Sequence, residues 1–443
     1  MDASKTTSPS PLKEQEPEKM NEQAIHLFTS ISANYLPKAR VLAHSAKKFH
    51  PDAQFHLVLC DLIPDFFVLE EEPFDSIITV EELGIPNLKP WLFKHNIMEM
   101  CTGIKGLAFE WIFDQYRCEK LLFFDPDIVI LSPLDTLIQK LDRHSILLTS
   151  HQTIPETDRE AIIDNEIHSL KVGVFNLGFL GIRNCENGRR FLEWWRDRCL
   201  EFCYDAPPNG LFTDQKWIDL TPAFFSDYLV LREPIYNVAT WNLTHRHATG
   251  NLEEGIEING KPICFYHFSG LDSGNQEFML KKYGKNSPVL FELRQWYLQE
   301  CEYYGQEQFA KIPCYYTKFD NGEMITQDQR LLYRSRQDLQ ALFPDPFLTS
   351  DPNYSYYHWF ATYGDSEYIP SRYKSLESAE QALQSTKESL QNTKEALHST
   401  EQALTAAQRE IETLKQWIQA MESSKFWKLR QAWFWLKKKL KAI

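Results

Sequence analysis

The run LLFFDPDIVIL at residues 121–131 most constrains what this chain can fold into, because it sets two carboxylates, Asp125 and Asp127, among apolar and aromatic side chains. A carboxylate that is buried without a partner costs so much free energy that it takes up a proton instead. We therefore expect the two acids at the end of a strand, in a turn, or facing a cation.

The segments around this run predict alternating strands and helices. Residues 24–31 and 55–61 have the continuous apolar character of buried strands, and the residues between them have helical spacing. A helix is predicted over 105–115 and a strand over 120–127, which puts both acids at the carboxyl end of a strand in an α/β sheet. Open sheets of this kind bind ligands at that edge.

The rest of the body is less regular. Strands are predicted at 145–150, 173–182, 228–233 and 262–268, and a helix over 188–202. Residues 271–370 look loop-like but are rich in aromatic side chains that can cover the body.

The Asp-x-Asp pair at a strand end offers two hard oxygen ligands to Mg²⁺ or Mn²⁺, which can bridge the protein to nucleotide phosphates. The same letters, with Val129, also fit the nucleophile motif of haloacid-dehalogenase-like phosphatases. That interpretation is weaker, because the motif arrives in a later strand and Gly364-Asp365 is followed by Ile369 where a second acid is needed.

Polar residues interrupt three further apolar segments of the sequence. They are Asn176 in FNLGFLGI, Asp214 and Gln215 in LFTDQKWIDL, and His267 in FYHFSG. Each alone has a structural explanation as a bulge, a helix cap or a core hydrogen bond. Their joint occurrence after a strand-end Asp-x-Asp favours a functional site.

These motifs together resemble the GT-A glycosyltransferases of family 8, the group that contains glycogenin and bacterial lipooligosaccharide galactosyltransferases. The motifs are Asn34-Tyr35 after the first strand, Asp125-Pro126-Asp127, FN-x-G at 175–178, Asp214-Gln215 and HF-x-G at 267–270. The resemblance covers roughly residues 24–275. It implies a GT-A fold, which is a Rossmann-like mixed sheet flanked by helices.

The resemblance also implies roles for individual residues. Mn²⁺ (or Mg²⁺) would be bound by Asp125, Asp127 and His267. The nucleotide and donor, a UDP-sugar by preference, would be bound by Thr29, Ser30, Asn34, Tyr35, Lys105, Asp125, Asn176 and Gly270, with Tyr35 stacked on the base. Asp214 and Gln215 would lie near the reacting anomeric carbon: Gln215 suits a retaining reaction, and Asp214 suits an inverting one as general base.

The chain departs from the family at two positions. The family carries an acid just before its Asn-Tyr, where this chain has Ser32-Ala33, and a lysine that holds the diphosphate shortly after HF-x-G, where Leu271 to Gln276 contain none. Lys281 and Lys282 are the nearest candidates to replace that lysine.

Charge and cysteine content exclude other classes of protein. The formal net charge is −14, with −18 in residues 1–373 and +4 in residues 374–443, so that the body is a poor candidate for binding nucleic acid. Nine cysteines without a C-x-x-C pair predict reduced thiols. The sequence shows neither a secretory signal nor an apolar stretch of about 20 residues, which predicts a soluble, cytoplasmic protein.

The C-terminal part has a different composition. From about Tyr373 a seven-residue repeat places Leu390, Leu397 and Leu404 at matching positions and predicts a coiled coil over 373–422, with self-association favoured over a single solvated helix. Residues 423–443 combine five aromatic residues with seven lysines and arginines and no acid. This composition predicts a helix on the anionic inner face of a membrane rather than one packed on the body.

The expected organisation is a disordered segment at 1–23, a GT-A domain at 24–275, an aromatic-rich extension at 276–372, the coiled coil, and the basic tail. The expected function is metal-dependent transfer of a sugar to a saccharide or lipid-linked acceptor in cell-surface polysaccharide synthesis. An inactive scaffold that binds a glycan or nucleotide at the membrane is the alternative from another class.

Overall fold

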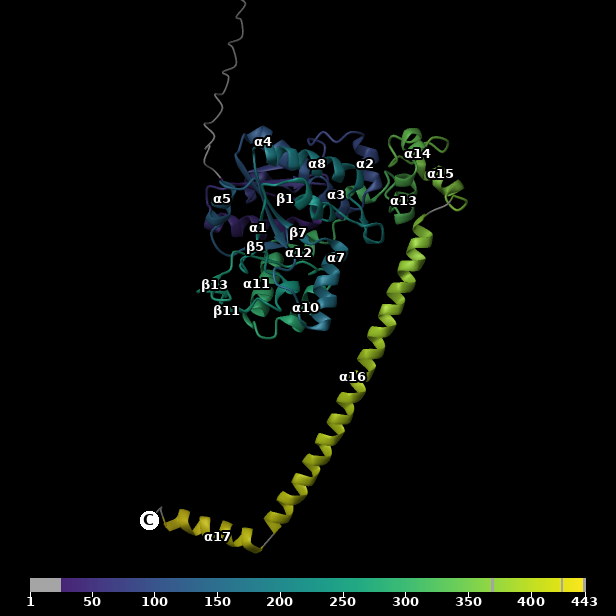
Figure 1. The fold of residues 1–443 in the computed structure, drawn as a ribbon. Coiled ribbons are helices and arrows are strands. Elements are labelled where there is room, and N and C mark those ends of the chain that lie inside the picture. Colours follow the sequence, from purple (N-terminus) through teal and green to yellow (C-terminus); the bar gives the residue numbers. More distant parts are fainter. Residues whose placement is uncertain (1–24, 368–369, 424, 441–443) are drawn as a thin grey trace, which may run out of the picture. The chain divides into compact units, whose positions relative to one another are not determined.

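A computed structural model describes residues 25–367, 370–423 and 425–440 of the 443-residue chain (Figure 1). The chain divides into two compact units, one ending at Glu367 and the other beginning at Tyr368. The segment 1–23, for which we predicted disorder, lies outside the described residues. Each unit is described by itself below.

The first unit is built on a mixed sheet of seven strands in the order β10-β6-β7-β4-β1-β2-β3. Neighbouring strands are parallel, except that β7 runs antiparallel to both β4 and β6. The strands are β1 His26–Ile31, β2 Gln54–Leu59, β3 Ser76–Thr79, β4 Lys120–Phe124, β6 Ile146–Ser150, β7 Phe175–Arg183 and β10 Leu229–Leu231. The prediction of a mixed α/β fold followed by a long C-terminal helix is confirmed.

The apolar run at β4 is explained by burial of both sheet faces. Successive residues of a strand point to opposite faces. Leu121 and Phe123 pack with helices α4 (Lys105–Tyr116) and α8 (Glu186–Phe202), whereas Leu122 and Phe124 pack with α1 (Leu36–Phe49) and α5 (Asp135–Leu141). Strands covered on both sides have no polar alternation, and the first polar residue, Asp125, marks the point where β4 leaves the sheet.

Two short strands bring the distant motifs together. After Asp127 the chain forms β5 (Ile128–Ile130), which pairs antiparallel with β14 (Phe265–His267) in the register His267↔Ile128. The backbone N–H of Phe268 also donates to the carbonyl oxygen of Asp127 at 2.9 Å. This pairing places His267 beside the Asp-x-Asp turn, although 140 residues separate His267 from Asp127 along the chain.

Residues 271–367 are largely helical, so that their loop-like interpretation was wrong. They contain α10 Asn275–Tyr283, α11 Val289–Tyr303, α12 Gln306–Phe309, α13 Gln327–Ser335, α14 Gln337–Leu342 and α15 Tyr356–Tyr363. The aromatic residues that obscured the helical period form packed pairs, such as Phe93 with Tyr333 and with Tyr356. Arg330 of α13 donates to the carbonyl oxygens of Leu92, Phe93 and His95 and so holds this extension to the end of α2 (Leu88–Lys94).

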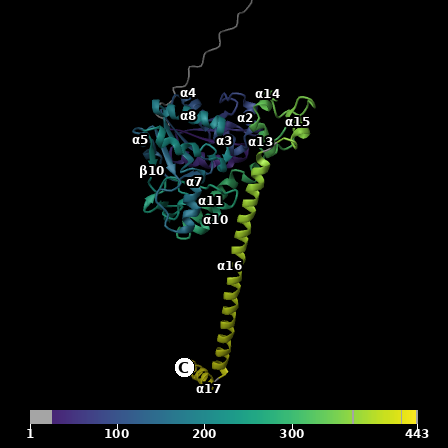
Figure 2. The ribbon, with the colours of Figure 1, turned by 45° about the vertical axis from the view of Figure 1, so that its right-hand side comes forward.

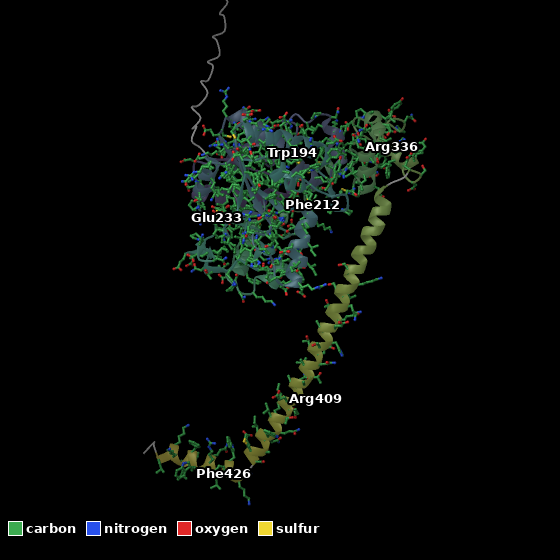
Figure 3. The ribbon with its side chains drawn as sticks, in the orientation of Figure 1. Trp194, Phe212, Glu233, Arg336, Arg409 and Phe426 are labelled. Atoms are coloured by element: carbon green, nitrogen blue, oxygen red, sulfur yellow. The ribbon has the colours of Figure 1, made fainter. Side chains whose placement is uncertain are left out.

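The second unit consists of two helices, α16 (Pro370–Ser423) and α17 (Lys425–Leu440). A helix of 54 residues is about 80 Å long at 1.5 Å per residue. In this single chain the repeat residues Leu390, Leu397 and Leu404 are each more than half exposed. Phe426 likewise projects from the surface of α17 (Figure 3). No helix among the described residues has the length and apolarity that crossing a membrane requires.

Candidate metal centre

Three predicted metal ligands meet at the end of β4. Imidazole Nε2 of His267 lies 3.1 Å from Oδ1 of Asp127 and 3.8 Å from Oδ2 of Asp125. One ligand atom from each residue can be chosen so that all three lie within 4.8 Å of one another. Carboxylate oxygens suit Mn²⁺ or Mg²⁺, and the imidazole nitrogen suits Mn²⁺ better than Mg²⁺, so that these residues fit the metal implied by the resemblance.

The charges of this triad depend on one another. Burial raises the pKa of Asp125, and the nearby Lys105 and His267 offset this only in part. Burial acts in the same sense on Asp127, but there His267, Lys38 and a backbone hydrogen bond together outweigh it and hold the pKa below its ordinary value. Burial lowers the pKa of His267, but Asp127 and Asp125 together outweigh this effect, so that the net shift is upward.

Asn237 orients His267 from behind. The side-chain oxygen of Asn237 lies 3.2 Å from Nδ1 of His267, so that an Nδ1–H can donate to it and Nε2 is directed at the acids. The amide nitrogen of Asn237 donates to the side-chain oxygen of Asn176 at 2.9 Å. Asn237 is fully buried in a left-handed conformation with φ of 51°, which Asn adopts more readily than most residues.

Gly178 leaves the space that the imidazole fills. A Cβ atom on Gly178 would lie 2.4 Å from Cε1 of His267 and 2.9 Å from the side-chain oxygen of Asn176. The glycine of the FN-x-G motif is therefore required by the metal centre rather than by the strand that carries it.

Lys105 joins the metal centre to the predicted sugar pocket. Its ammonium lies 3.2 Å from Asp125 and 3.1 Å from Asp214, and it donates to the carbonyl oxygen of Leu177. Burial lowers the pKa of Lys105, but Asp125 and Asp214 outweigh it, so that the net shift is upward. Lys105 is thus a fixed cation between the two acids.

An amide network positions Asn176 and Gln215. The side-chain oxygen of Gln215 accepts hydrogen bonds from the backbone N–H of Leu177 at 3.1 Å and from the amide of Asn176 at 3.3 Å. Its amide nitrogen donates to the carbonyl oxygen of Val172. These bonds fix the orientation of the Gln215 amide.

The residues predicted around the nucleotide base lie on β1 and the turn after it. Thr29 is buried, and Ser30 donates to the carbonyl oxygen of Cys101 at 2.7 Å. Asn34 accepts from Ser32, while the hydroxyl of Tyr35 donates to Asp272 at 2.5 Å. Gly270 lies in the loop after β14 with φ of 78°. Contacts of these residues with a base stay a prediction.

Several residues of this site were not predicted from the sequence. Asn237 lies in the segment PIYN, where an Asn after a strand looks like an ordinary turn residue. Lys38 lies between the first two predicted strands, in residues with helical spacing where a lysine is normally exposed, yet it is buried and paired with Asp272. A positive-φ asparagine and a buried ion pair between distant segments leave no local sequence signal.

No family model matches this chain. It is 28% identical over 176 residues to the uncharacterized protein YfnF of Bacillus subtilis (strain 168), covering 39% of this chain and 56% of that relative. It is 25% identical over 251 residues to the uncharacterized protein YfnD of the same organism, covering 55% of this chain and 77% of that one. The chain thus spans little more than half the length of the first of these relatives.

Solved glycosyltransferases are also found by similarity of structure. One is the galactosyltransferase LgtC in complex with donor and acceptor sugar analogs, with 17% identity, 59% of this chain and 96% of that chain covered, and a TM-score of 0.36. Such neighbours are of the same class as the GT-A glycosyltransferases that the motifs resemble.

Proposed function

We propose that this protein is a metal-dependent glycosyltransferase that moves a sugar from a nucleoside-diphosphate sugar, a UDP-sugar by preference, to a saccharide or lipid-linked acceptor. The observation that carries the proposal is the convergence of Asp125, Asp127 and His267, within 4.8 Å, at the carboxyl edge of the sheet. Two buried carboxylates beside an imidazole are costly in an apolar core unless a positive charge compensates them, and a divalent cation would supply that charge.

The residues of the chain have distinct tasks in this reaction. Asp125, Asp127 and His267 would hold Mn²⁺ or Mg²⁺, which when bound offsets the charge that develops on a departing nucleoside diphosphate. Lys105 adds a second, permanent positive charge, held in place by Asp214. Asn176 supplies an amide at the pocket wall, and its orientation is fixed by Asn237.

We favour a retaining reaction. Hydrogen bonds from Leu177 and Asn176 hold the Gln215 side-chain oxygen in one position, and this fixed dipole would stabilise positive charge at the anomeric carbon. Asp214 is paired with Lys105 and is 2% exposed, and this pairing disfavours it as the general base of an inverting reaction.

The test is donor hydrolysis by the full chain with Mn²⁺. We expect one nucleotide sugar of a panel to release its nucleoside diphosphate, and Asp127→Asn to slow this release at least 100-fold. Asp142→Asn, which removes a carboxylate paired with Lys120, is the matched control and should leave the rate unchanged. If no donor is hydrolysed and Asp127→Asn does not alter nucleotide binding, a binding scaffold becomes the better interpretation.

An exposed apolar helix face on the segment that contacts Gln215 supports a lipid-linked acceptor. The helical segment 159–172 comprises α6 (Arg159–Ala161), the π-helix η3 (Ile162–Ile167) and α7 (His168–Val172). Ile163, Ile167 and Leu170 recur along one side of it and are 42–68% exposed. The segment ends at the carbonyl oxygen of Val172, which binds Gln215. Figures 1 and 2 both place α7 beside α10, and Lys282 of α10 contacts Asp164 at 2.7 Å.

The second unit adds two proposals about partners. Exposed Leu and Ile residues that recur every seven positions along α16 support self-association through a coiled coil over 373–422. On α17, Phe426, Trp433 and Leu440 are each more than 60% exposed beside lysines and arginines, which supports binding to an anionic membrane surface, on its inner face. Together with the apolar face at 159–172, this supports a role in cell-surface polysaccharide synthesis.

A further inference from the structure

Lys38 is a buried cation for which the proposed reaction has so far no use. Its side chain is 2% exposed, and its ammonium lies 2.7 Å and 2.6 Å from the two carboxylate oxygens of Asp272. Burying an ammonium is costly, so that a buried lysine needs a strong partner. Asp272 is that partner, but its own side chain is 52% exposed.

Asp272 lies in the loop that follows the metal ligand His267. The loop has left-handed glycines on both sides of Asp272, Gly270 with φ of 78° and Gly274 with φ of 77°. Asp272 also accepts a hydrogen bond from the hydroxyl of Tyr35, whose ring lies 4.1 Å from the Lys38 ammonium. Tyr35, Lys38 and Asp272 thus form one cluster, which we call the Lys38 cluster.

The Lys38 cluster adjoins the metal centre. Asp272 is five residues from His267, and Phe268 between them is bonded to the backbone of Asp127. Burial raises the pKa of Asp127, and His267 lowers it. Lys38 is a further group that lowers this pKa. The positive charge of Lys38 therefore acts on a carboxylate that would bind the divalent ion.

The other lysines near the site differ from Lys38 in burial or in the number of their carboxylate partners. Lys105 is buried between Asp125 and Asp214. Lys281 and Lys282, the candidates from the sequence, pair with Glu277 and with Asp164 respectively. Lys38 differs from all three because it is buried and pairs with a single carboxylate, which is carried by a loop between two glycines.

We propose that Lys38 binds the diphosphate of the donor. Before the donor binds, Asp272 pairs with Lys38 as an internal counter-anion, and the diphosphate then displaces Asp272. The inference rests on the proposed function and assigns the diphosphate contact to α1 rather than to the segment after HF-x-G. A diphosphate beside the divalent ion is a stronger anion than one carboxylate, so that the exchange is favourable when donor and metal are both present.

The test compares two substitutions that should change affinity in opposite directions. With the full chain and Mn²⁺, calorimetry would measure the Kd for UDP and for UMP. Lys38→Met keeps the apolar stem and removes the charge, and we expect it to weaken UDP at least tenfold and UMP much less. Asp272→Asn frees Lys38 and should tighten UDP at least threefold. Lys48→Met, on the exposed side of the same helix, is the matched control and should change neither Kd.

The double variant Lys38→Met, Asp272→Asn should bind UDP as Lys38→Met does, because the effect of Asp272 acts through Lys38. If Lys38 only anchors the loop, both single variants weaken UDP or leave it unchanged, and this result overturns the inference. If Lys38→Met does not fold, the sign of the Asp272→Asn effect decides. If the wild type binds no UDP with Mn²⁺, the proposed donor class fails and the inference fails with it; if the wild type binds and Lys38→Met binds equally well, only the inference fails.

Discussion

At the scale of single residues, Gly178 shows how closely the metal centre is packed. No residue larger than glycine fits at position 178 beside the imidazole of His267, since even a methyl group would overlap Cε1 and Nδ1. We predict that Gly178→Ala weakens Mn²⁺ binding by about 10- to 100-fold, the range for disturbed supports of metal ligands. The measurement is a titration of the full chain with Mn²⁺.

Gly181→Ala is the matched control, because Gly181 lies on the same strand. There an added methyl group meets Cδ2 of Leu122 at 3.0 Å, a flexible side-chain end, so that a stability loss of about 1 kcal/mol with unchanged Mn²⁺ affinity is expected. Equal loss of Mn²⁺ affinity in both variants would show that Gly178 matters only for the strand.

A second residue-scale prediction concerns pH. His26 and His56 are buried with their rings stacked, and Nδ1 of His26 lies 3.0 Å from Nε2 of His56. Burial lowers the pKa of His26 to about 4 and that of His56 to about 3, from an ordinary value of 6.5. Because the folded state binds fewer protons than the unfolded state, this contribution to stability is complete above pH 6.5 and is lost as the pH falls toward 4.

The loss is on the order of 3 kcal/mol for one buried imidazole between pH 7 and pH 4. His56→Leu should therefore flatten the fall in the free energy of unfolding with decreasing pH, measured by urea denaturation at several pH values. His247→Gln, at an exposed position, should follow the wild-type curve. A slope in His56→Leu that equals the wild-type slope would contradict the prediction.

At the scale of elements, most of the sheet could be predicted from local sequence, whereas the grouping of Asp125, Asp127 and His267 was predicted from the family resemblance. Strand β4 is apolar on both faces, so that the polar residues Asp125 and Asp127 after it mark its end. The antiparallel direction of β7 has no such signal, because direction depends on which strands become neighbours. The helices after Leu271 were missed because their aromatic residues also pack with other elements, which hides the 3.6-residue period.

At this scale we predict that the exposed apolar face of the helical segment 159–172 contributes to transfer to a lipid-linked acceptor. If its exposed apolar face contacts the apolar part of an acceptor, replacing Ile167 and Leu170 by serine removes that contact and leaves the donor site intact. Each side chain should cost about tenfold in kcat/KM for a lipid-linked acceptor, since partial burial of an aliphatic side chain is worth about 1.4 kcal/mol. Donor hydrolysis in water should not change.

Tyr303→Ser removes an aromatic side chain that is 81% exposed on α11 and is the control for a general loss of surface apolarity. If the double variant transfers sugar to the lipid-linked acceptor as fast as the wild type, the face has another use. If it slows donor hydrolysis as well, the segment supports Gln215 rather than the acceptor.

At the scale of the whole molecule, an acidic body and a basic C-terminal unit are joined in one chain. The body carries the proposed chemistry, and α17 carries cations beside exposed aromatic rings, with Lys439 lying 4.3 Å from the ring of Trp435. If α17 holds the protein at an anionic surface, the net negative charge of residues 1–373 should oppose binding, and the lysines of α17 must outweigh that repulsion.

This balance can be tested in the full chain by comparing two variants that lose the same number of positive charges from different helices. Replacing Lys437, Lys438 and Lys439 by glutamine should reduce binding to vesicles that contain anionic lipid by about 100-fold, since each lysine near such a surface contributes about 1 kcal/mol. Replacing Lys387, Lys394 and Lys415 of α16 by glutamine changes the net charge equally and should have little effect if only α17 contacts the lipid. Vesicle co-sedimentation at two salt concentrations measures both. Equal losses in the two triple variants would mean that net charge, and not the aromatic helix, determines the binding.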